Sequence, residues 1–393
     1  MIKKSKVTSV NLESLNNPYK TILMAQDKDQ KTLNVPPLRF PGFTDDWKKS
    51  TVQDAANFSN GKAHENCVDE SGSYILVNSK FISTNGSIYK RVSSQLSPLY
   101  KGQFVMVMSD LPNGKALSKC YFIEADNTYT LNQRICSFTA IDGNDSRFLM
   151  YQVNRNSYYL RFDDGINQTN LKKCEVLSCP INLPTYQEQK KISKFLKLLD
   201  ERITTQNKII DNLQSLIKGL AKTLTHQEEP NVRISDCLEC HTSTLQEGAL
   251  NENGQYPVYG ASGIAGLLDD YRCDEDSILI IKDGSGAGTV SYATGKYSVI
   301  GTLNYLTAKA DYSLKYLYFC LMEFNFEPFK TGMAIPHIYF RDYGQAKIYC
   351  PPIEGQEQIA KALTLIEDKL NIESQVLQSL YIEKQYLLNN MLI

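Results

Sequence analysis

Glycine and cysteine motifs are the strongest candidates for chemistry in this chain. Residues 283–288 read Asp-Gly-Ser-Gly-Ala-Gly and follow an apolar run, as glycine loops that hold phosphate groups do. Residues 289–294 predict a strand and a turn, so the helix N-terminus that receives phosphate in such loops is missing and a β-turn is favoured. Residues 237–241 read Cys-Leu-Glu-Cys-His, the spacing of a haem attachment or of half a zinc site. Haem attachment takes place outside the cytoplasm and zinc would need two more ligands, so no metal site is predicted.

The rest of the chain has no enzyme motif. The four histidines, His64, His226, His241 and His337, form no recognisable set with a serine or cysteine nucleophile. Residues 17–19, Asn-Pro-Tyr, are similar to the Asn-Pro-Pro-Tyr loop of adenine methyltransferases, but they lack one proline and lie in a polar tail. Walker, helicase and paired-carboxylate nuclease patterns are missing. These residues therefore predict no catalytic, metal or cofactor site in the chain, and binding chemistry remains.

Polar and basic side chains in predicted loops are the remaining candidates, and their chemistry is binding. Asn, Gln and Arg read base edges in a DNA groove, whereas Lys, Ser and backbone amides hold phosphates. The candidates in the first half are Asn78, Lys80, Tyr89, Lys90, Arg91, Asn113, Lys115, Gln133, Arg134 and Gln168. Those in the second half are Tyr259, Ser262, Lys282, Ser285, Lys296, Asn304, His337 and Arg341. Because the surface loops of any soluble protein are polar, these residues do not by themselves decide for DNA.

The composition is that of an ordinary globular protein. With 393 residues the chain can form two or three domains, and 42% hydrophobic and 22% charged residues are typical of a soluble protein. No apolar run reaches the roughly 18 residues of a membrane span, and the basic residues 1–6 are not followed by the apolar stretch of a signal peptide. Ten scattered cysteines fit a reducing compartment, so we expect a cytoplasmic protein. The net charge of −1 neither supports nor excludes nucleic-acid binding.

Apolar runs and turn residues predict an α+β chain with two globular domains, each followed by a long helix. The predicted segments are a polar tail at 1–35, a first domain at 36–183, a first helix at 184–229, a second domain at 230–350 and a second helix at 351–393. Strands are predicted at 74–77, 104–108, 135–138, 256–259 and 277–281. Shorter helices are predicted at 147–161 and 314–324.

The chain contains one sequence pattern twice, 167 residues apart. Residues 162–224 align without a gap on residues 329–391, and each copy passes through a loop, a short apolar strand, a proline and a long helix. The period is too long for a solenoid repeat, so it indicates two similar domains related by a pseudo-two-fold axis. Duplex DNA, which has two similar faces, would suit such a chain.

Apolar residues repeat every 3.5 positions along both long helices, which is typical of a coiled-coil seam. The seam of the first helix contains Ile192, Leu196, Leu199, Ile203, Gln206, Ile210 and Leu213, and continues to Leu224. That of the second contains Ile359, Leu363, Ile366, Leu370, Glu373, Leu377 and Leu380, and continues to Met391. Gln206 and Glu373 occupy equivalent positions near the helix midpoints, where a buried polar pair could fix the register. Our hypothesis is that the two helices pair antiparallel.

The repeated loop, proline, Gln-x-x-Ile sequence and heptad helix together resemble the specificity subunit of type I restriction-modification systems. The matching residues of the first copy are Gly165, Gln168, Asn170, Leu171, Pro184, Glu188, Gln189 and Ile192. Those of the second are Gly332, Ala334, Pro336, His337, Ile338, Pro351, Pro352, Gln356 and Ile359. Residues 38–43, Leu-Arg-Phe-Pro-Gly-Phe, are similar to the start of that family's first domain. The resemblance covers residues 35–393 and departs from the pattern at Gly355, which stands where the first copy has Glu188.

The resemblance implies two target recognition domains, each reading one half of a split DNA sequence, and helices that set the spacing between the halves. It also implies that this chain is non-catalytic and docks two methyltransferase subunits and restriction subunits, which carry S-adenosylmethionine, ATP and magnesium. Two alternatives remain: a methyltransferase or fused restriction enzyme with its own catalysis, and a coiled-coil scaffold or adaptor without DNA specificity. The missing catalytic loops argue against the first, and two elaborate, divergent domains argue against the second.

Overall fold

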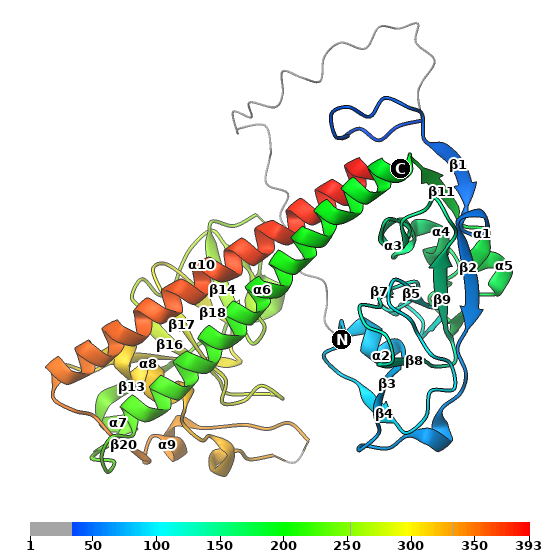
Figure 1. Ribbon diagram of the computed structural model, residues 1–393. Helices are drawn as coiled ribbons and strands as arrows, with labels where there is room; N and C mark the ends of the chain where they lie inside the picture. Colours follow the sequence, from blue (N-terminus) through cyan, green and yellow to red (C-terminus); the bar gives the residue numbers. More distant parts are fainter. Residues whose placement is uncertain (1–33, 252, 333) are drawn as a thin grey trace, which may run out of the picture. The chain divides into compact units, whose positions relative to one another are not determined.

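The computed structural model describes residues 34–251, 253–332 and 334–393, so nearly all of the predicted tail and the motif at 17–19 lie outside the described residues. The chain divides into two compact units, both with mixed helix and strand content (Figure 1). Unit 1 comprises the described residues up to Phe195 together with Tyr386–Ile393, and unit 2 comprises Leu196–Gln385. Each unit is treated by itself below.

Unit 1 is built from short strands and short helices. Its strands are β1 Lys48–Thr51, β2 Ala56–Asn60, β3 Tyr74–Val77, β4 Lys90–Val92, β5 Phe104–Val107, β6 Ser109–Asp110, β7 Cys120–Phe122, β8 Tyr129–Leu131, β9 Ile135–Ala140, β10 Thr169–Asn170 and β11 Pro180–Leu183. Its short helices are α1 Val52–Ala55, α2 Ser79–Ser83, α3 Ser146–Val153, α4 Ser157–Leu160 and α5 Lys173–Leu177. A four-stranded sheet has the order β2-β9-β5-β7, and a three-stranded sheet has the order β4-β3-β8.

Unit 2 contains a corresponding set of elements. Its strands are β12 Val232–Arg233, β13 Leu238–Thr242, β14 Tyr256–Gly260, β15 Gly263–Leu268, β16 Ser277–Ile281, β17 Val290–Ala293, β18 Ser298–Val299, β19 Leu303–Ala308 and β20 Lys347–Ile348. Its short helices are α7 Ile234–Cys237, α8 Leu314–Met322 and α9 Phe340–Tyr343.

The sheets of the two units follow the same plan. The four-stranded sheet β13-β19-β16-β17 corresponds to β2-β9-β5-β7, and every neighbouring pair in both is antiparallel. In both three-stranded sheets the central strand has one antiparallel and one parallel neighbour. Each unit also has a two-stranded ladder, β1-β11 or β12-β20, and unit 1 has the further ladder β6-β10. The repetition read from the sequence therefore extends to the sheet topology.

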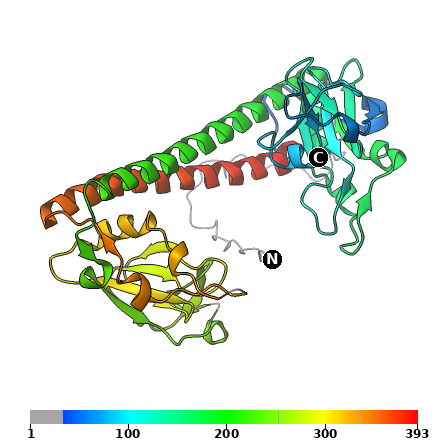
Figure 2. The same ribbon diagram turned by 90° about the horizontal axis from the view of Figure 1, so that it is seen from below.

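One central strand of each four-stranded sheet, β5 or β16, is largely apolar and buried on both faces. All four residues of β5 and all five of β16 are buried, which explains why they read as continuous apolar runs rather than as alternating ones. In unit 2, α8 packs one face of this sheet together with the side chains of Ile217 and Leu363 from the long helices. Figure 2 shows α8, in yellow, between the sheet and those helices.

Most of the predicted short elements are confirmed, including the strand after the glycine loop, but the helix predicted at 147–161 is wrong as a single element. The segment forms α3 and α4, which are separated by residues 154–156. Arg155 has a φ of 55°, which a right-handed helix does not allow. The side chain of Asn156 accepts a hydrogen bond from the Tyr158 amide at 2.9 Å and caps α4. Asparagine competes with the helix backbone in this way, whereas the prediction weighed only apolar spacing.

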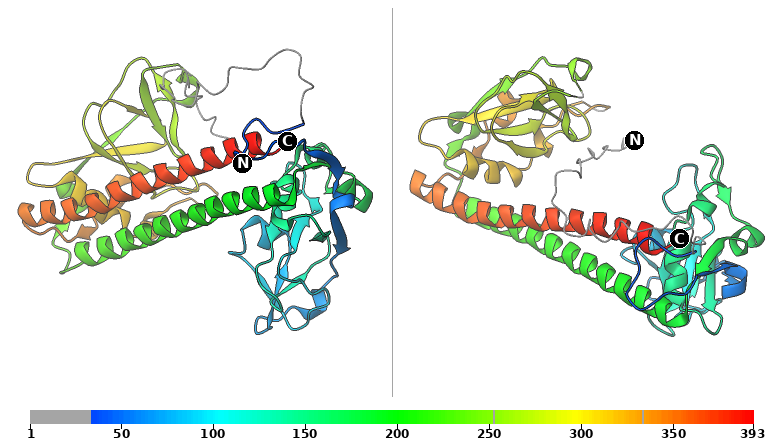
Figure 3. Two further views of the ribbon diagram at one scale, coloured as in Figure 1. Left: turned by 45° about the horizontal axis from the view of Figure 1, so that its top comes forward. Right: turned by 90° about the horizontal axis from the view of Figure 1, so that it is seen from above.

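Two long helices dominate the rest of the structure: α6 spans Tyr186–Thr225 and α10 spans Ile353–Met391. Both belong to unit 1 at one end and to unit 2 for the remainder. Within unit 2 they run in opposite directions, because Asp200 pairs with Lys384 at 2.5 Å while Gln206 lies against Glu373. Figure 3 shows the two helices, green and red, side by side from two directions.

The predicted seam positions of α6 and α10 are buried or half-buried. Gln206 is 7% exposed, and its amide nitrogen donates to the backbone carbonyl of Glu373 at 3.0 Å and to the Glu373 carboxylate. The two polar seam residues therefore meet, as the sequence suggested. Among the described helices, none combines the length and the apolar character needed to cross a membrane.

Candidate nucleic-acid interface

In unit 1, three loops meet beyond the end of β5. The amide of Met108 donates to the carbonyl of Arg134 at 3.0 Å, which places the β8–β9 turn beside this strand end. Gln168 donates to the Ser109 hydroxyl at 2.8 Å, and Asn113 donates to the carbonyl of Gly165 at 3.1 Å. The predicted residues Asn113, Lys115, Gln133, Arg134 and Gln168, all exposed, are thus brought together on one loop surface.

A carboxylate inside this loop surface holds the β6–β7 turn. One oxygen of Asp110 accepts the amides of Ala116 at 2.6 Å and Leu117 at 3.0 Å, and the other accepts the amide of Leu111 at 2.9 Å. Three backbone donors on one anion form a rigid turn, because hydrogen bonds to an ionised acceptor are stronger than neutral ones. The turn holds Leu111 outward, with 69% of the side chain exposed.

The neighbouring loop at residues 163–167 has the same kind of support. Asp164 accepts hydrogen bonds from the amides of Ile166 and Asn167, both at 2.8 Å. The Asn167 amide contributes most to this effect, and together these donors lower the pKa of the Asp164 carboxyl to about 2. Ile166 is 79% exposed at this tip. Sequence reasoning missed both aspartates, although the turn residues around them, Asp-Leu-Pro-Asn-Gly at 110–114 and Asp-Gly at 164–165, are a signal for turns closed by an Asp side chain.

The other predicted residues of unit 1 form a second group around α2 and β4. Asn78 accepts the Phe81 amide at 2.9 Å and caps α2, which is a structural role. Arg91 donates to the carbonyl of Gly72 at 3.1 Å and lies over the ring of Tyr89. Lys80, Tyr89 and Lys90 are exposed.

In unit 2, Lys282, Ser285 and His337 lie together beyond the end of β16. The amide of Ile338 donates to the carbonyl of Lys282 at 2.9 Å, and that of Gly284 donates to the carbonyl of Pro336 at 2.9 Å. His337 bonds the Asp283 carboxylate through Nδ1 at 2.7 Å. The glycine loop and the repeated loop around Gly332 are therefore one surface, as their counterparts are in unit 1.

A second group in unit 2 combines a lysine with tyrosines. The Lys296 ammonium lies 4.6 Å from the ring centre of Tyr271, and the interaction with Tyr271 is the main cause of the raised pKa of Lys296. Tyr271 in turn packs against Tyr256. Tyr259 packs edge-on against Tyr297, and Ser262 is exposed in the turn between β14 and β15. A cation among aromatic rings is a common arrangement at surfaces that bind nucleic-acid bases.

Two predicted residues of unit 2 differ sharply in exposure. Asn304 lies within β19 and is 4% exposed beside the buried Tyr343, so its side chain does not reach the surface. Sequence position alone placed it in a loop, and the strand register instead turns it inward. Arg341 has a 79% exposed side chain over the ring of Tyr339.

The cysteine motif at 237–241 is part of the fold of unit 2. Cys237 closes α7, is buried and donates to the carbonyl of Arg233 at 3.0 Å. His241 is on β13, bonds the Thr307 hydroxyl at 3.0 Å and stacks on Tyr305. In the described ranges, no cluster of three or more potential metal ligands is found.

Each unit thus presents polar loops beyond the end of a buried strand, β5 or β16, an arrangement typical of binding surfaces. The family model of the type I restriction-modification DNA specificity domain matches this chain twice, at residues 44–215 and 229–381. The chain belongs to this family of type I specificity subunits, whose members are DNA-binding proteins of restriction-modification systems.

Relatives with curated names agree with this family. A Haemophilus influenzae protein named as a type I restriction enzyme specificity subunit is 28% identical over 120 residues, which cover 30% of this chain and 31% of that protein. A Methanocaldococcus jannaschii protein named as the specificity subunit of the type I restriction enzyme MjaX is 23% identical over 262 residues, covering 58% and 62%. The alignments therefore span less than two thirds of the length of these relatives.

The fold also has a counterpart among solved structures. The crystal structure of a type I restriction-modification S subunit from M. genitalium matches with a TM-score of 0.66 at 18% identity. The match covers 91% of this chain and 99% of that one. At this identity, the likeness concerns the fold.

Proposed function

We propose that this chain is the non-catalytic, cytoplasmic DNA-recognition subunit of a type I restriction-modification complex and reads a split target, one half-site with each unit. The observation that carries the proposal is that the specificity-domain model matches twice and that both matches have one sheet plan. The loops beyond β5 and β16 differ in length and sequence between the units. A shared scaffold with different loops suits the reading of two different base sequences.

The proposed partners are two methyltransferase subunits, with restriction subunits joining the assembly. S-adenosylmethionine, ATP and magnesium would be bound by those partners. The outer faces of the long helices support docking, because large apolar side chains remain in solvent there. Leu198, Leu365, Ile372 and Ile382 are 54%, 63%, 54% and 60% exposed. Rows of exposed apolar side chains on a helix are typical of protein interfaces.

In this proposal, the long helices set the number of unread base pairs between the half-sites. The support is their length, since α6 has 40 residues and α10 has 39, which corresponds to roughly 60 Å at 1.5 Å per residue. Half-sites on one face of B-DNA are separated by about 34 to 36 Å for each helical turn. The Gln206–Glu373 pair would fix the register of the two helices and so keep this spacing constant.

The proposal is tested by co-expressing the chain with its methyltransferase subunit in a host that lacks adenine methylation and mapping modified adenines across the genome. We expect a split motif with a fixed unread spacer. Modification without a split motif would contradict the reading of two half-sites. A stable complex that modifies nothing would favour the scaffold alternative.

The spacer role has its own test. Inserting seven residues after Leu213 and seven at the facing level of α10 adds about two turns to each helix while keeping the seam in phase. We expect a longer unread spacer with both half-sites unchanged. As the control, an insertion of seven residues in the Gln227–Asn231 connection leaves the helices intact and should leave the spacer unchanged. Altered half-sites with an unchanged spacer would overturn the role of the helices.

A further inference from the structure

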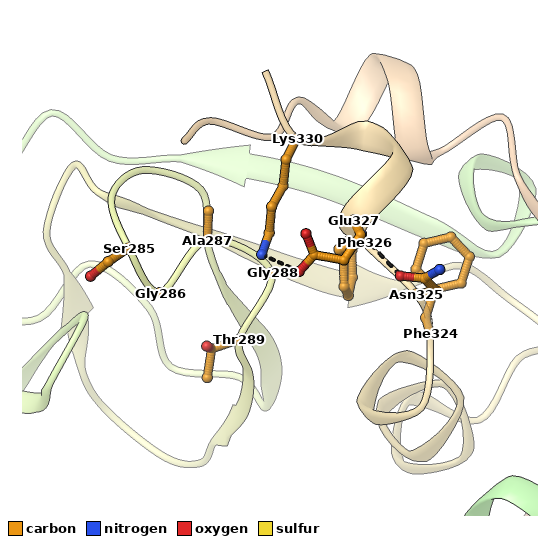
Figure 4. A pocket seen from close by; sticks show the side chains of 10 residues that line it. All are labelled: Ser285, Gly286, Ala287, Gly288, Thr289, Phe324, Asn325, Phe326, Glu327 and Lys330. Carbon is orange, nitrogen blue, oxygen red and sulfur yellow. Dashed lines mark hydrogen bonds and ion pairs between the residues drawn. The ribbon is translucent and has the colours of Figure 1, made fainter. Parts of the chain in front are cut away.

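We propose that the glycine-rich loop of residues 283–289 and Lys330 of unit 2 form an oxyanion site for one phosphate group of the DNA backbone, an inference that rests on the proposed function. The loop lines a cavity of about 280 Å³ together with Phe324, Phe326 and Lys330. Figure 4 shows Lys330 reaching across this pocket, with its ammonium group against Glu327. The ammonium and the Glu327 carboxylate are 2.6 Å apart.

The glycine-rich loop of unit 2 has a counterpart in unit 1, and aligning the two shows which groups their backbone amides bind. His337 pairs with Asp283 in unit 2 as Asn170 pairs with Ser109 in unit 1, and the sequence repeat places Asn170 on His337. Asp283 therefore corresponds to Ser109, and Gly284 corresponds to Asp110. At the far end of the loop, Gly288 donates its amide to the carbonyl of Ile281 at 2.8 Å, as Ser118 donates to that of Val107 at 2.9 Å.

The two loops differ in what their amides bind. Counting back from this shared bond, Gly286 and Ala287 correspond to Ala116 and Leu117. In unit 1 both amides bind the carboxylate of Asp110. Unit 2 has Gly284 in place of that aspartate, so its loop amides have no carboxylate at this position, and the neighbouring Asp283 carboxylate bonds His337 instead.

Two backbone amides of the unit 2 loop are left available among the described residues. Ala287 donates to the carbonyl of Gly284 at 3.0 Å, but within the described part of the chain the amides of Ser285 and Gly286 have no hydrogen-bond partner. The Ser285 and Thr289 side chains, both exposed, add two hydroxyls at the rim. Consecutive free amides in a glycine-rich turn form a concave anion site without any helix N-terminus. The β-turn predicted from the sequence is therefore compatible with phosphate binding.

The charges beside the two loops also favour anion binding in unit 2. Lys330 corresponds to Asp163 in the repeat, so unit 2 has a cation where unit 1 has an anion. The lysine side chain is 26% exposed beside the pocket, whereas that of its partner Glu327 is 74% exposed. A phosphate would replace Glu327 as the partner of the ammonium group, because lysine binds phosphate as a point charge.

The loop backbone is also held open by close packing. Gly288 has a φ of 90°, and a Cβ atom there would lie 2.8 Å from the Cβ of Phe326. Only glycine allows the chain to pass so close to this ring in that conformation. The pocket floor is thus fixed by Phe326, which is 5% exposed, while the rim stays polar.

Phosphate groups could come from the DNA backbone or from free phosphate, and the first experiment separates the two sources. Amide signals of the isotope-labelled full chain are followed by NMR during titration with inorganic phosphate and, separately, with a short mixed-sequence duplex at low salt. We expect the Ser285 and Gly286 amides to shift with both, and at far lower concentration with the duplex. Shifts with phosphate but none with the duplex would assign the site to free phosphate and overturn the DNA source. Unmoved amides in both titrations would overturn the site.

The second experiment compares duplex affinity between charge variants of the full chain. Lys330→Gln should weaken binding several-fold and reduce the dependence of log Kd on log salt by about 1, as expected for one lost phosphate contact. Glu327→Gln should strengthen binding, because it removes the competing carboxylate. The matched control is Lys347→Gln, which removes an exposed lysine of β20 outside the pocket. Equal effects of Lys330→Gln and Lys347→Gln would overturn the site.

Failure of this inference differs from failure of the proposed function. If Lys330→Gln leaves affinity and salt dependence unchanged while the complex still modifies a split motif, only the oxyanion site is wrong. If the complex modifies no split motif while phosphate still shifts the Gly286 amide, the recognition role fails and the DNA source of the phosphate fails with it.

Discussion

Unit 1 and unit 2 have the same sheet plan. The contacts that join each unit to its adjoining long helix are partly the same and partly different. The shared contact is a glutamine in the first turns of α6 and α10. Gln189 accepts the amide of Asp145, the cap of α3, at 2.9 Å and donates to the carbonyl of Pro184 at 3.0 Å. Gln356 accepts the amide of Ser313, the cap of α8, at 2.9 Å and donates to the carbonyl of Pro351 at 2.8 Å.

The two units differ at the residue that precedes this glutamine. In unit 1, Glu188 is fully buried and binds the guanidinium of Arg39 through both of its oxygens, at 2.6 and 2.7 Å. The hydrogen bond with Glu188 is the main cause of the raised pKa of Arg39. In unit 2 this position is Gly355, and α8 is joined to the long helix α10 by other residues. Lys315 of α8 pairs with Glu367 at 2.7 Å, and Tyr318 donates to the same carboxylate at 2.9 Å.

This difference between Glu188 and Gly355 is linked to the Leu38–Phe43 segment of unit 1. Arg39 belongs to the Leu38–Phe43 segment, which lies along α6 through the Phe40–Phe195 ring contact. A buried glutamate is tolerable only with a fixed cation, so the arginine segment and Glu188 occur together. Unit 2 has glycine in the place of Glu188, and its ion pair is partly exposed. The glutamine therefore stabilises a contact that both units have, whereas Glu188 stabilises the packing of the Leu38–Phe43 segment in unit 1.

The largest expected effect is the loss of the buried ion pair in unit 1. Arg39→Met leaves the Glu188 carboxylate buried without a partner, so we expect a loss of about 3 to 5 kcal/mol in the free energy of unfolding. Urea denaturation measures it, and hydrogen exchange should locate the loosening at the start of α6. Adding Glu188→Met should recover much of the loss.

The control for this prediction is a second arginine–glutamate pair of unit 1. Arg147→Met breaks the 2.5 Å pair with Glu124, whose side chain is 53% exposed. Exposed pairs contribute about 0 to 1 kcal/mol, and loss of the contact with the Phe122 ring adds a similar amount. An Arg39→Met effect no larger than that of Arg147→Met would contradict the role of the buried pair.

The next effect should be equal in the two units. Gln189→Ala and Gln356→Ala each leave a helix-cap amide and a proline carbonyl without their partner, and Gln189→Ala also removes a longer hydrogen bond of 3.4 Å to the Asn144 side chain. We expect each to lower the free energy of unfolding by roughly 2 kcal/mol. Gln345→Ala, at an exposed position of unit 2, is the control. Effects that differ by more than about 1 kcal/mol between the two variants would break the equivalence of the units.

A smaller effect should differ in sign or size between the units. The Tyr159 hydroxyl donates to the carbonyl of Val176 at 2.9 Å, so Tyr159→Phe should lower the free energy of unfolding by about 1 kcal/mol. Tyr343 occupies the repeat position of Val176. Its buried hydroxyl has no partner of normal hydrogen-bond geometry among the described residues. Tyr343→Phe removes an unsatisfied group, so we expect no loss or a slight gain in thermal unfolding. Equal losses would contradict this difference in packing.

The smallest expected effect concerns pH and the seam pair. The hydrogen bonds from Lys369 and then from Gln206 lower the pKa of the Glu373 carboxyl below its ordinary value of 4.5. Because this pKa is lower in the folded state, the stabilisation is present above about pH 4.5 and is lost as the pH falls through the folded-state pKa. Gln206→Leu should flatten this part of the pH profile of thermal unfolding. Asn207→Leu, one position along α6, is the control, and an unchanged slope in Gln206→Leu would contradict the contribution of the pair.

Much of the secondary structure could be predicted because its signals are local. The heptad spacing along α6 and α10 and the apolar runs of β5 and β16 depend on neighbouring residues alone. The break at Asn154–Asn156 was missed because an asparagine side chain competes with the helix at one point, which a count of apolar spacing does not register. The sequence predicts a loop position for Asn304, because nothing adjacent to it shows that β19 turns its side chain inward.

The site was predictable only as a set of loops. Polar residues after β5 and β16 were recognised from the sequence, yet which of them gather at one strand end depends on pairings such as Gln168 with Ser109 and His337 with Asp283. The Asp110 carboxylate that fills the loop of unit 1, and the glycine that leaves the loop of unit 2 open, have meaning only once the two strand registers are aligned.

The duplication, the two long helices and the family resemblance were readable from the order of residues, because helix period, proline position and repeated motifs are properties of short segments. The antiparallel meeting of Gln206 with Glu373, the burial of Glu188 under Arg39 and the open amides beside Lys330 were decided by the tertiary structure. Hydrogen bonding and charge compensation join residues far apart in the chain, and a buried polar group is stable only where folding brings its partner to it.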